Sequence, residues 1–177
     1  MSNPLHPWID HPFGVARPIR HWLTDRGSLT RRLKARCADF RVVPLARGLR
    51  RPLPDERARL GTGFAERAYV REVLLRCQGE AVVFAHSVLA RGGLRGAWNG
   101  ITRLGSRPLG EALFANPRIR RESLSYRSID RRHPLYRILQ RHLDVDARRL
   151  WARRSLFTLD GRALLVTEVF LPRIASL

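Results

Sequence analysis

The sequence contains few cysteines and no long apolar run, and both shortages exclude classes of protein. Its 177 residues include only two cysteines, Cys37 and Cys77, which fall in different predicted elements. A disulfide-based scaffold is therefore excluded, a reducing cytoplasm is the expected compartment, and both cysteines are expected to pack as small apolar groups. The longest apolar runs reach about half the length of a membrane-spanning helix, and residues 1–4 lack the basic and apolar regions of a signal peptide. We therefore predict a cytoplasmic protein that is not integral to a membrane.

Motifs for metals and nucleotides are also missing. Gly61-Thr62-Gly63 is not followed by the third glycine of a dinucleotide-binding loop, and no Gly-Lys-Ser/Thr sequence occurs. The six histidines form no HExxH motif and the cysteines no CxxC motif, which argues against a zinc site. Ser87 lies outside any Gly-x-Ser-x-Gly motif, so a serine hydrolase has little support.

Lysine is almost absent although the chain is strongly basic. Basic residues number 34 against 15 acidic ones, for a net charge of +19, yet Lys34 is the only lysine. The preference for arginine over lysine is as readily explained by a GC-rich genome, which favours arginine codons, as by selection for a phosphate-binding face. The arginines occur in scattered pairs without interleaved aromatic residues, unlike the continuous basic and aromatic surfaces that bind nucleic acids. We expect no nucleic-acid partner, but we expect the positive field to attract small anions.

The pattern of elements predicts an α+β protein with an antiparallel sheet. One hairpin is expected over residues 68–76 and 81–89, and a second over 151–159 and 162–171, where Asp160-Gly161 favours a type I′ turn. Regular βαβ alternation is absent. The length fits one domain over residues 1–177, with an irregular lead-in over 1–17. Further expected elements are strands at 40–45 and 122–129, helices beginning near residues 18, 28, 108 and 133, and a loop over 46–63.

Strand alternation places two charged residues on apolar faces. Arg71 shares a face with Tyr69, Val73 and Leu75, and Glu168 shares one with Leu164, Val166 and Phe170. Because an unpaired buried charge is costly, each should have a partner or line a ligand cavity. A two-residue turn at 160–161 places Glu168 opposite Arg153, so a structural ion pair is one interpretation of Glu168.

Two leucines occupy the first turns of predicted helices. Leu29 follows Ser28, and Leu109 follows Pro108. First-turn N–H groups lack partners within the helix, and the helix dipole favours anions there. Most leucines at such positions only pack against the core, so this signal needs independent support.

Several segments, taken together, resemble the chorismate pyruvate-lyase (4-hydroxybenzoate synthase) family of ubiquinone biosynthesis. They occur in the order of the family and cover residues 22–30, 69–75, 108–110, 113–114, 151–155 and 165–172. The resemblance implies an antiparallel sheet with helices packed on one face and an active site enclosed beneath helical flaps. It also implies conversion of chorismate to 4-hydroxybenzoate and pyruvate without a metal or organic cofactor. Because a product enclosed beneath flaps should leave slowly, we predict that its release limits turnover and that 4-hydroxybenzoate inhibits. The segment over residues 117–150 is longer than the corresponding segment in the shorter members of the family. The resemblance therefore gives no role to the helix after His133.

The resemblance also implies a role for each candidate residue. Arg71 and the backbone N–H groups of Leu29 and Leu109 would bind the ring carboxylate, and Glu168 would contact the hydroxyl group at the far end of the ring. Glu168 could transfer a proton or could hold the hydroxyl in place during an intramolecular elimination. The alternatives are a non-catalytic small-acid-binding domain, for which no attached DNA-binding segment is evident, and a basic RNA-associated protein. A monomer is the simplest expectation.

Overall fold

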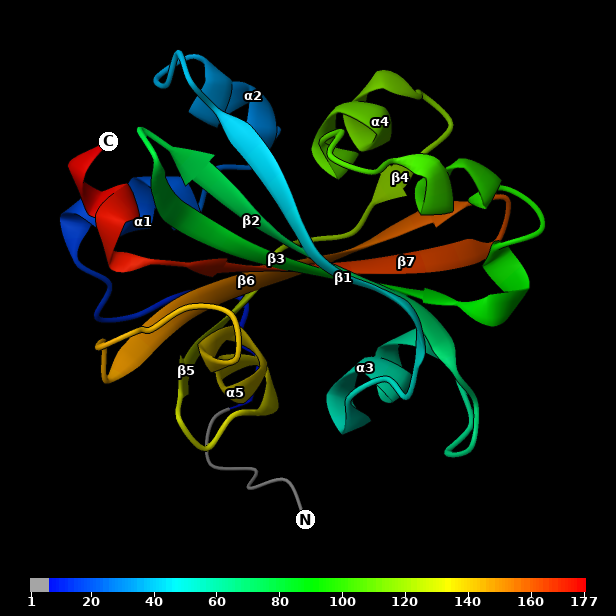
Figure 1. Cartoon of the computed structure of the whole chain (residues 1–177). Coiled ribbons are helices and arrows are strands. Elements are labelled where there is room, and N and C mark those ends of the chain that lie inside the picture. The colour runs from blue at the N-terminus through cyan, green and yellow to red at the C-terminus, as the bar shows by residue number, and fades with distance from the viewer. Residues whose placement is uncertain (1–6) are drawn as a thin grey trace.

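Seven strands form one sheet in the computed structural model, which describes residues 7–177. The order is β1-β2-β3-β7-β6-β4, with β5 also paired to β6, and every pairing is antiparallel (Figure 1). This confirms the α+β class with a single antiparallel sheet. The strands are β1 (Arg41–Arg50), β2 (Ala68–Cys77), β3 (Glu80–Ala90), β4 (Arg120–Arg121), β5 (Ser125–Asp130), β6 (Arg149–Leu159) and β7 (Arg162–Phe170).

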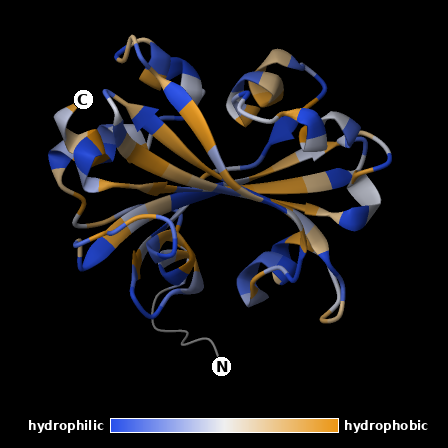
Figure 2. Cartoon of the chain, in the orientation of Figure 1, coloured by the Kyte–Doolittle hydropathy of each residue, from blue (hydrophilic) through white to orange (hydrophobic). Residues whose placement is uncertain are grey.

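Helices cover both faces of the sheet rather than the single face that the resemblance implied. The apolar side chains of β2 alternate, so Val73 and Leu75 pack in one core with Trp22, whereas Leu74 packs in a second core with Tyr136. Figure 2 shows hydrophobic residues along the strands and on helices at both faces of the sheet. The helices are α1 (Arg17–Leu23), α2 (Leu29–Lys34), α3 (Pro54–Leu60), α4 (Leu109–Ala115) and α5 (Pro134–Gln140), with 3₁₀ turns η1 (Arg91–Gly93), η2 (Asn99–Arg103) and η3 (Pro172–Ser176).

Both predicted hairpins form, and their turns fix the register of the sheet. Asp160 and Gly161 have φ values of 50° and 71°, as a type I′ turn requires. Gln78 and Gly79, with φ values of 53° and 76°, make an equivalent turn between β2 and β3. The resulting register places Arg153 opposite Glu168, as the turn length predicted.

The predicted loop over residues 46–63 is wrong, because β1 extends to Arg50 and α3 follows. Pro44 does not end β1, since β1 is an edge strand and its register shifts between Pro44 and Ala46. Pro54 opens α3, and Glu56 accepts a hydrogen bond from the N–H of Leu53 at 2.8 Å. Of the predicted strand at 122–129, only the part from residue 125 onward is a strand, β5, and the two-residue strand β4 lies before it.

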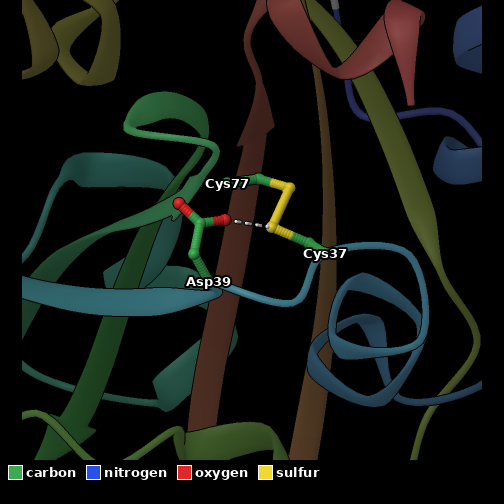
Figure 3. A group of neighbouring side chains, drawn as sticks. All are labelled: Cys37, Asp39 and Cys77. Carbon is green, nitrogen blue, oxygen red and sulfur yellow. Dashed lines mark hydrogen bonds between the residues drawn. A yellow bond between two sulfur atoms is a disulfide. The ribbon is translucent and has the colours of Figure 1, made fainter.

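The expectation of two separately packed cysteines is also wrong. Cys37 and Cys77 form a disulfide, with their Cα atoms 5.7 Å apart (Figure 3). The chain after α2 leads into β1, and β1 pairs with β2, so the end of β2 returns to Cys37. Asp39 fixes this corner by accepting hydrogen bonds from the N–H groups of Gln78 (2.7 Å) and Gly79 (3.2 Å).

The described part of the N-terminal lead-in runs irregularly along the sheet. Residues 7–16 contain no helix, and Ile9 forms an isolated antiparallel bridge with Tyr126. Residues 1–6 of the predicted lead-in lie outside the described residues. Among residues 7–177, no helix combines the length and the apolar character needed to cross a membrane.

Candidate active site

A cavity lies between the sheet and the two short helices α2 and α4. Its walls include all four predicted site residues, Leu29, Arg71, Leu109 and Glu168. The cavity volume that the centre of a water molecule can reach is about 40 Å³. This is several times the volume needed to hold one water molecule. The structure therefore brings together residues that lie up to 139 positions apart in the chain.

The floor of the cavity consists of two neighbouring cross-strand rows. In one row Arg71 on β2 is followed by Ser87 on β3, Val166 on β7 and Ser155 on β6. The next row contains Glu168, which pairs with Ala85 on β3 and Arg153 on β6. Because alternate residues of a strand point to the same face, both rows point toward α2 and α4.

Arg71 is a buried cation without an acidic partner among residues 7–177. Its side chain is 5% exposed, and its Nη2 donates hydrogen bonds to the carbonyls of Gly105 and Arg107, both at 3.0 Å. Burial lowers the pKa of Arg71, and the nearby positive charge of Arg47 lowers it further. An anion bound in the cavity would supply the missing counter-charge.

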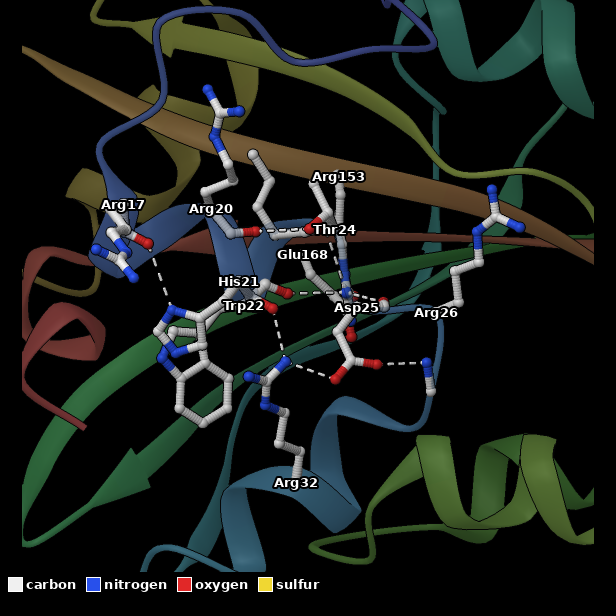
Figure 4. A network of polar contacts seen from close by, with 12 residues as sticks. Arg17, Arg20, His21, Trp22, Thr24, Asp25, Arg26, Arg32, Arg153 and Glu168 are labelled. Carbon is white, nitrogen blue, oxygen red and sulfur yellow. Dashed lines mark hydrogen bonds and ion pairs between the residues drawn. The ribbon is translucent and has the colours of Figure 1, made fainter.

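Glu168 is held by Arg153. The Nε of Arg153 donates to the Oε2 of Glu168 at 2.5 Å, and its Nη1 donates to the carbonyls of Trp22 (3.0 Å), Leu23 (3.3 Å) and Asp25 (2.6 Å), as Figure 4 shows. These carbonyls lie at and just beyond the end of α1, where a cation is favourable. Arg153 thereby fixes Glu168 to the segment that leads into α2.

The first turns of α2 and α4 face the cavity. Ser28 caps α2, and its Oγ accepts a hydrogen bond from the N–H of Arg31 at 3.3 Å. Pro108 precedes the first residue of α4. Within residues 7–177, the N–H groups of Leu29 and Leu109 donate to no protein acceptor, so both can bind an anion.

The two covering helices also contact each other. Lys34 on α2 forms an ion pair with Glu111 on α4. A Cβ atom added to Gly110 would lie 3.0 Å from the Oγ1 of Thr30, which shows how closely the backbone of α4 approaches this side chain of α2. The two helices thus form a joined cover over this side of the cavity.

Arg121 on β4 is a cavity residue that the sequence analysis missed. Its Nε donates to the Oγ of Ser155 at 2.9 Å, and its guanidinium group lies 5.3 Å from the ring centre of Phe157. The predicted strand began at residue 122, so the alternation argument never included Arg121. A predicted strand that included residue 121 would have been needed to identify Arg121 as a candidate.

Cys37, Asp39 and Cys77 are the one group within residues 7–177 whose ligand atoms are spaced to hold a metal ion. Both sulfur atoms are joined in the disulfide, and Asp39 already binds two backbone N–H groups. Because metal ions bind cysteine as the thiolate, the oxidised pair cannot serve as ligands. None of the three residues lines the cavity.

An arginine-lined cavity between one antiparallel sheet and two short helices defines an α+β protein with a site suited to a small anion. The chorismate lyase family matches residues 10–176, so the chain belongs to the chorismate lyase family. A relative from Thiobacillus denitrificans is 58% identical, with 96% of this chain and 90% of the relative covered, and one from Nitrosomonas europaea is 46% identical, with 99% and 98% covered. Both are named "Probable chorismate pyruvate-lyase".

Solved structures of low sequence identity share this fold. The PhnF C-terminal domain is 18% identical, with a TM-score of 0.57 over 74% of this chain and 82% of that chain. The effector domain of PhnF from Mycobacterium smegmatis is 15% identical, with a TM-score of 0.54 over 83% and 90%. At this level of identity the similarity concerns the fold alone.

Proposed function

We propose that this protein converts chorismate to 4-hydroxybenzoate and pyruvate. The observation that carries the proposal is that one cavity contains both Arg71, a cation without an acidic partner among residues 7–177, and the fixed carboxylate of Glu168. Chorismate is a cyclic acid with a ring carboxylate at one end and a hydroxyl group at the other. A cation and a hydrogen-bond acceptor are the groups that these two ends require. Membership of the chorismate lyase family supports the same conclusion.

The proposed carboxylate site combines one side chain with two backbone groups. The guanidinium of Arg71 faces the ring carboxylate, and the N–H groups of Leu29 and Leu109 complete its hydrogen bonds. Because both leucines act through their backbone, apolar substitutions at these positions should preserve binding. Glu168 accepts a hydrogen bond from the ring hydroxyl.

The proposed chemistry needs orientation and exclusion of water. The bond between the ring and the ether oxygen breaks, the hydroxyl-bearing ring carbon loses its hydrogen, and the methylene of the leaving enolpyruvyl group gains a proton to give pyruvate. All atoms of chorismate are then found in the two products, and no co-reactant is needed. Because the ring becomes aromatic, the driving force lies in the substrate, and the protein fixes its reactive conformation in a dry cavity.

The experiment that tests this function is a product assay on the purified chain. Chorismate and EDTA are mixed with the protein, and 4-hydroxybenzoate and pyruvate are measured in equal amounts. Arg71→Met should reduce both turnover and 4-hydroxybenzoate affinity, because it leaves a buried carboxylate without its main counter-charge. Absence of turnover in the folded wild-type protein would contradict the proposal.

The second candidate function is the binding of a small acid without turnover. It is favoured by one observation: Glu168, the only acidic residue among the cavity walls in the described chain, is occupied by Arg153. This candidate predicts tight 4-hydroxybenzoate binding with no pyruvate released from chorismate. The product assay therefore separates the two candidates.

We further propose a single-domain monomer that acts in the cytoplasm, without a cofactor or a nucleic-acid partner. The single domain is supported by the sheet, because strands from Arg41 to Phe170 all belong to one sheet. In a reducing compartment the Cys37–Cys77 disulfide would be exposed to reduction. Sedimentation at micromolar concentration tests the monomer, and a salt titration of RNA binding tests the absence of a nucleic-acid partner.

A further inference from the structure

Chorismate carries two carboxylates, and Arg71 accounts for only one of them. Two further arginines line the cavity, Arg121 and Arg153. Arg153 is committed to Glu168 and to backbone carbonyls at the end of α1. Arg121 forms no ion pair with any acidic residue between positions 7 and 177. It is therefore the second cavity cation that is available to an anion.

The guanidinium group of Arg121 is fixed at one side and free at the other. Its Nε donates to the Oγ of Ser155 at 2.9 Å, and its Nη1 donates to the carbonyl of Arg26 at 2.6 Å. The rings of Phe114 and Phe157 lie 5.4 Å and 5.3 Å from it. Its Nη2 has no acceptor among the described residues. Such a group needs little reorganisation to bind a carboxylate.

Arg121 lies at the Glu168 side of the cavity, away from Arg71. Ser155, its hydrogen-bond partner, is three strands from Arg71 in the same row, which is about 14 Å at the usual strand spacing. Burial lowers the pKa of Arg121, as does the nearby charge of Arg153, whereas Glu168 acts to raise it. Arg121 and Glu168 also line the same cavity.

This position matches the substrate. The ring carbon that carries the enolpyruvyl ether is next to the carbon that carries the hydroxyl group. With the ring carboxylate at Arg71 and the hydroxyl at Glu168, the second carboxylate lies on the Glu168 side. Arg121 also borders a separate polar surface pocket, whose other charged residues are Arg59, Arg154, Asp10 and Glu122.

We propose that Arg121 binds the carboxylate of the enolpyruvyl group, the part of chorismate that leaves as pyruvate. The proposal rests on the proposed function and deepens it, because it assigns a residue to the half of the substrate that 4-hydroxybenzoate lacks. Arg121 therefore distinguishes substrate from retained product. Arg71 and Glu168 hold the ring in both, whereas Arg121 holds only the substrate.

The test compares Arg121→Met with Arg120→Met, the exposed neighbouring arginine on β4. Two quantities are measured for each variant: kcat/KM for chorismate and the dissociation constant of 4-hydroxybenzoate. For Arg121→Met, kcat/KM should fall about 10- to 100-fold, the loss expected for one charge-assisted hydrogen-bonded pair. Its 4-hydroxybenzoate affinity should change by less than about threefold. Arg120→Met should change neither quantity.

Each outcome bears on a different claim. Equal losses in chorismate turnover and 4-hydroxybenzoate affinity would overturn the proposal, since Arg121 would then support the cavity as a whole. An unchanged kcat/KM would overturn it as well. Retained 4-hydroxybenzoate binding also shows that Arg121→Met is folded, and Arg121→Lys should recover part of kcat/KM because it keeps the charge. If the wild-type protein does not convert chorismate, the proposed function fails independently of any variant.

Discussion

Glu168 is the residue that separates two mechanisms for ring aromatisation. As an acid–base group it would have to carry a proton while Arg153, which is itself fixed by three carbonyls, donates to its Oε2 at 2.5 Å. As an orienting group it carries no proton and keeps its contact with Arg153. The geometry therefore favours orientation of the ring hydroxyl by Glu168.

Substitution of Glu168 by Gln measures this preference. The amide keeps a hydrogen-bond acceptor for the hydroxyl, so we expect kcat to fall by less than about tenfold, whereas acid–base catalysis contributes about 10² or more. Single-turnover kinetics with chorismate give the rate of the chemical step directly. A loss of two orders of magnitude, with 4-hydroxybenzoate affinity intact, would assign proton transfer to Glu168.

At the residue scale, sequence reasoning succeeds where strand parity and a defined turn apply. Alternation predicts Arg71 and Glu168 each on an apolar face of its strand, the structure places both at one cavity, and the Asp160-Gly161 turn pairs Glu168 with Arg153. Arg121 was inaccessible to this reasoning because β4 is only two residues long and its start carries no periodic signal. A contact between a short edge strand and a cavity depends on tertiary packing, which a local pattern does not encode.

The α2 segment depends on the Cys37–Cys77 disulfide, which joins the chain after α2 to the end of β2. The bond closes a loop with a sequence separation of 40 residues. The chain-entropy relation gives about 4 kcal/mol for a loop of that size. We expect Cys37→Ser to lower the free energy of unfolding by about this amount, measured by denaturant titration. Dithiothreitol should destabilise the wild-type protein to the same extent and leave Cys37→Ser unchanged; an equal effect on both would show that the bond is not the cause.

The contact between α2 and α4 lies over the cavity, and we expect it to slow the exit of a bound product. Lys34→Glu replaces the exposed Lys34–Glu111 ion pair with two like charges. We expect 4-hydroxybenzoate to dissociate about two- to fivefold faster, in keeping with the small energies of exposed pairs, and kcat to rise if product release limits turnover. Stopped-flow displacement measures the dissociation rate. The double variant Lys34→Glu with Glu111→Lys restores opposite charges and should restore the slow rate; if it does not, the pair does not hold the helices together.

At the element scale, the hairpins were predictable and α3 was not. Gln78-Gly79 and Asp160-Gly161 are strong local turn signals, so the strands they join follow from the sequence. Pro52, Pro54 and Gly61 indicated a loop, although Pro54 opens α3 and Gly61, with φ of 63°, ends it. The same residue types mark loops and helix ends, and the short helix between them is stabilised by packing on the second face of the sheet.

The whole molecule places a buried charge network on the face opposite the cavity. His86 lies between two carboxylates, with Nε2 3.1 Å from Glu56 Oε1 and Nδ1 3.3 Å from Glu72 Oε1. Both carboxylates are almost fully buried, and His142 and Arg50 approach Glu72 to 3.8 Å. Glu56 belongs to α3, Glu72 to β2 and His86 to β3. The network therefore joins α3 to the sheet, and the sequence analysis assigned it no role.

This network makes the stability of the fold depend on pH. Burial alone lowers the pKa of His86, but Glu56 and Glu72 outweigh burial and raise it from 6.5 to about 9. Because the protonated form is favoured in the folded state, its stabilising effect is fully present below pH 6.5 and is lost as the pH rises toward 9. The shift corresponds to about 3 kcal/mol.

His86→Gln removes this titration and isolates its contribution. The free energy of unfolding, measured by denaturant titration from pH 6 to pH 9.5, should be lower in the variant than in the wild type at pH 6, because two carboxylates remain buried without their cation. This difference in the free energy of unfolding should shrink by about 3 kcal/mol between pH 6 and pH 9.5.

His133 is the matched control, since burial, followed by the charge of Arg127, lowers its pKa to about 4. His133 stabilises the fold above pH 6.5 and loses this effect only as the pH falls toward 4, so His133→Gln should leave the slope between pH 6.5 and 9 unchanged. A pH-independent difference between the wild type and His86→Gln would show that His86 is not protonated in the folded protein.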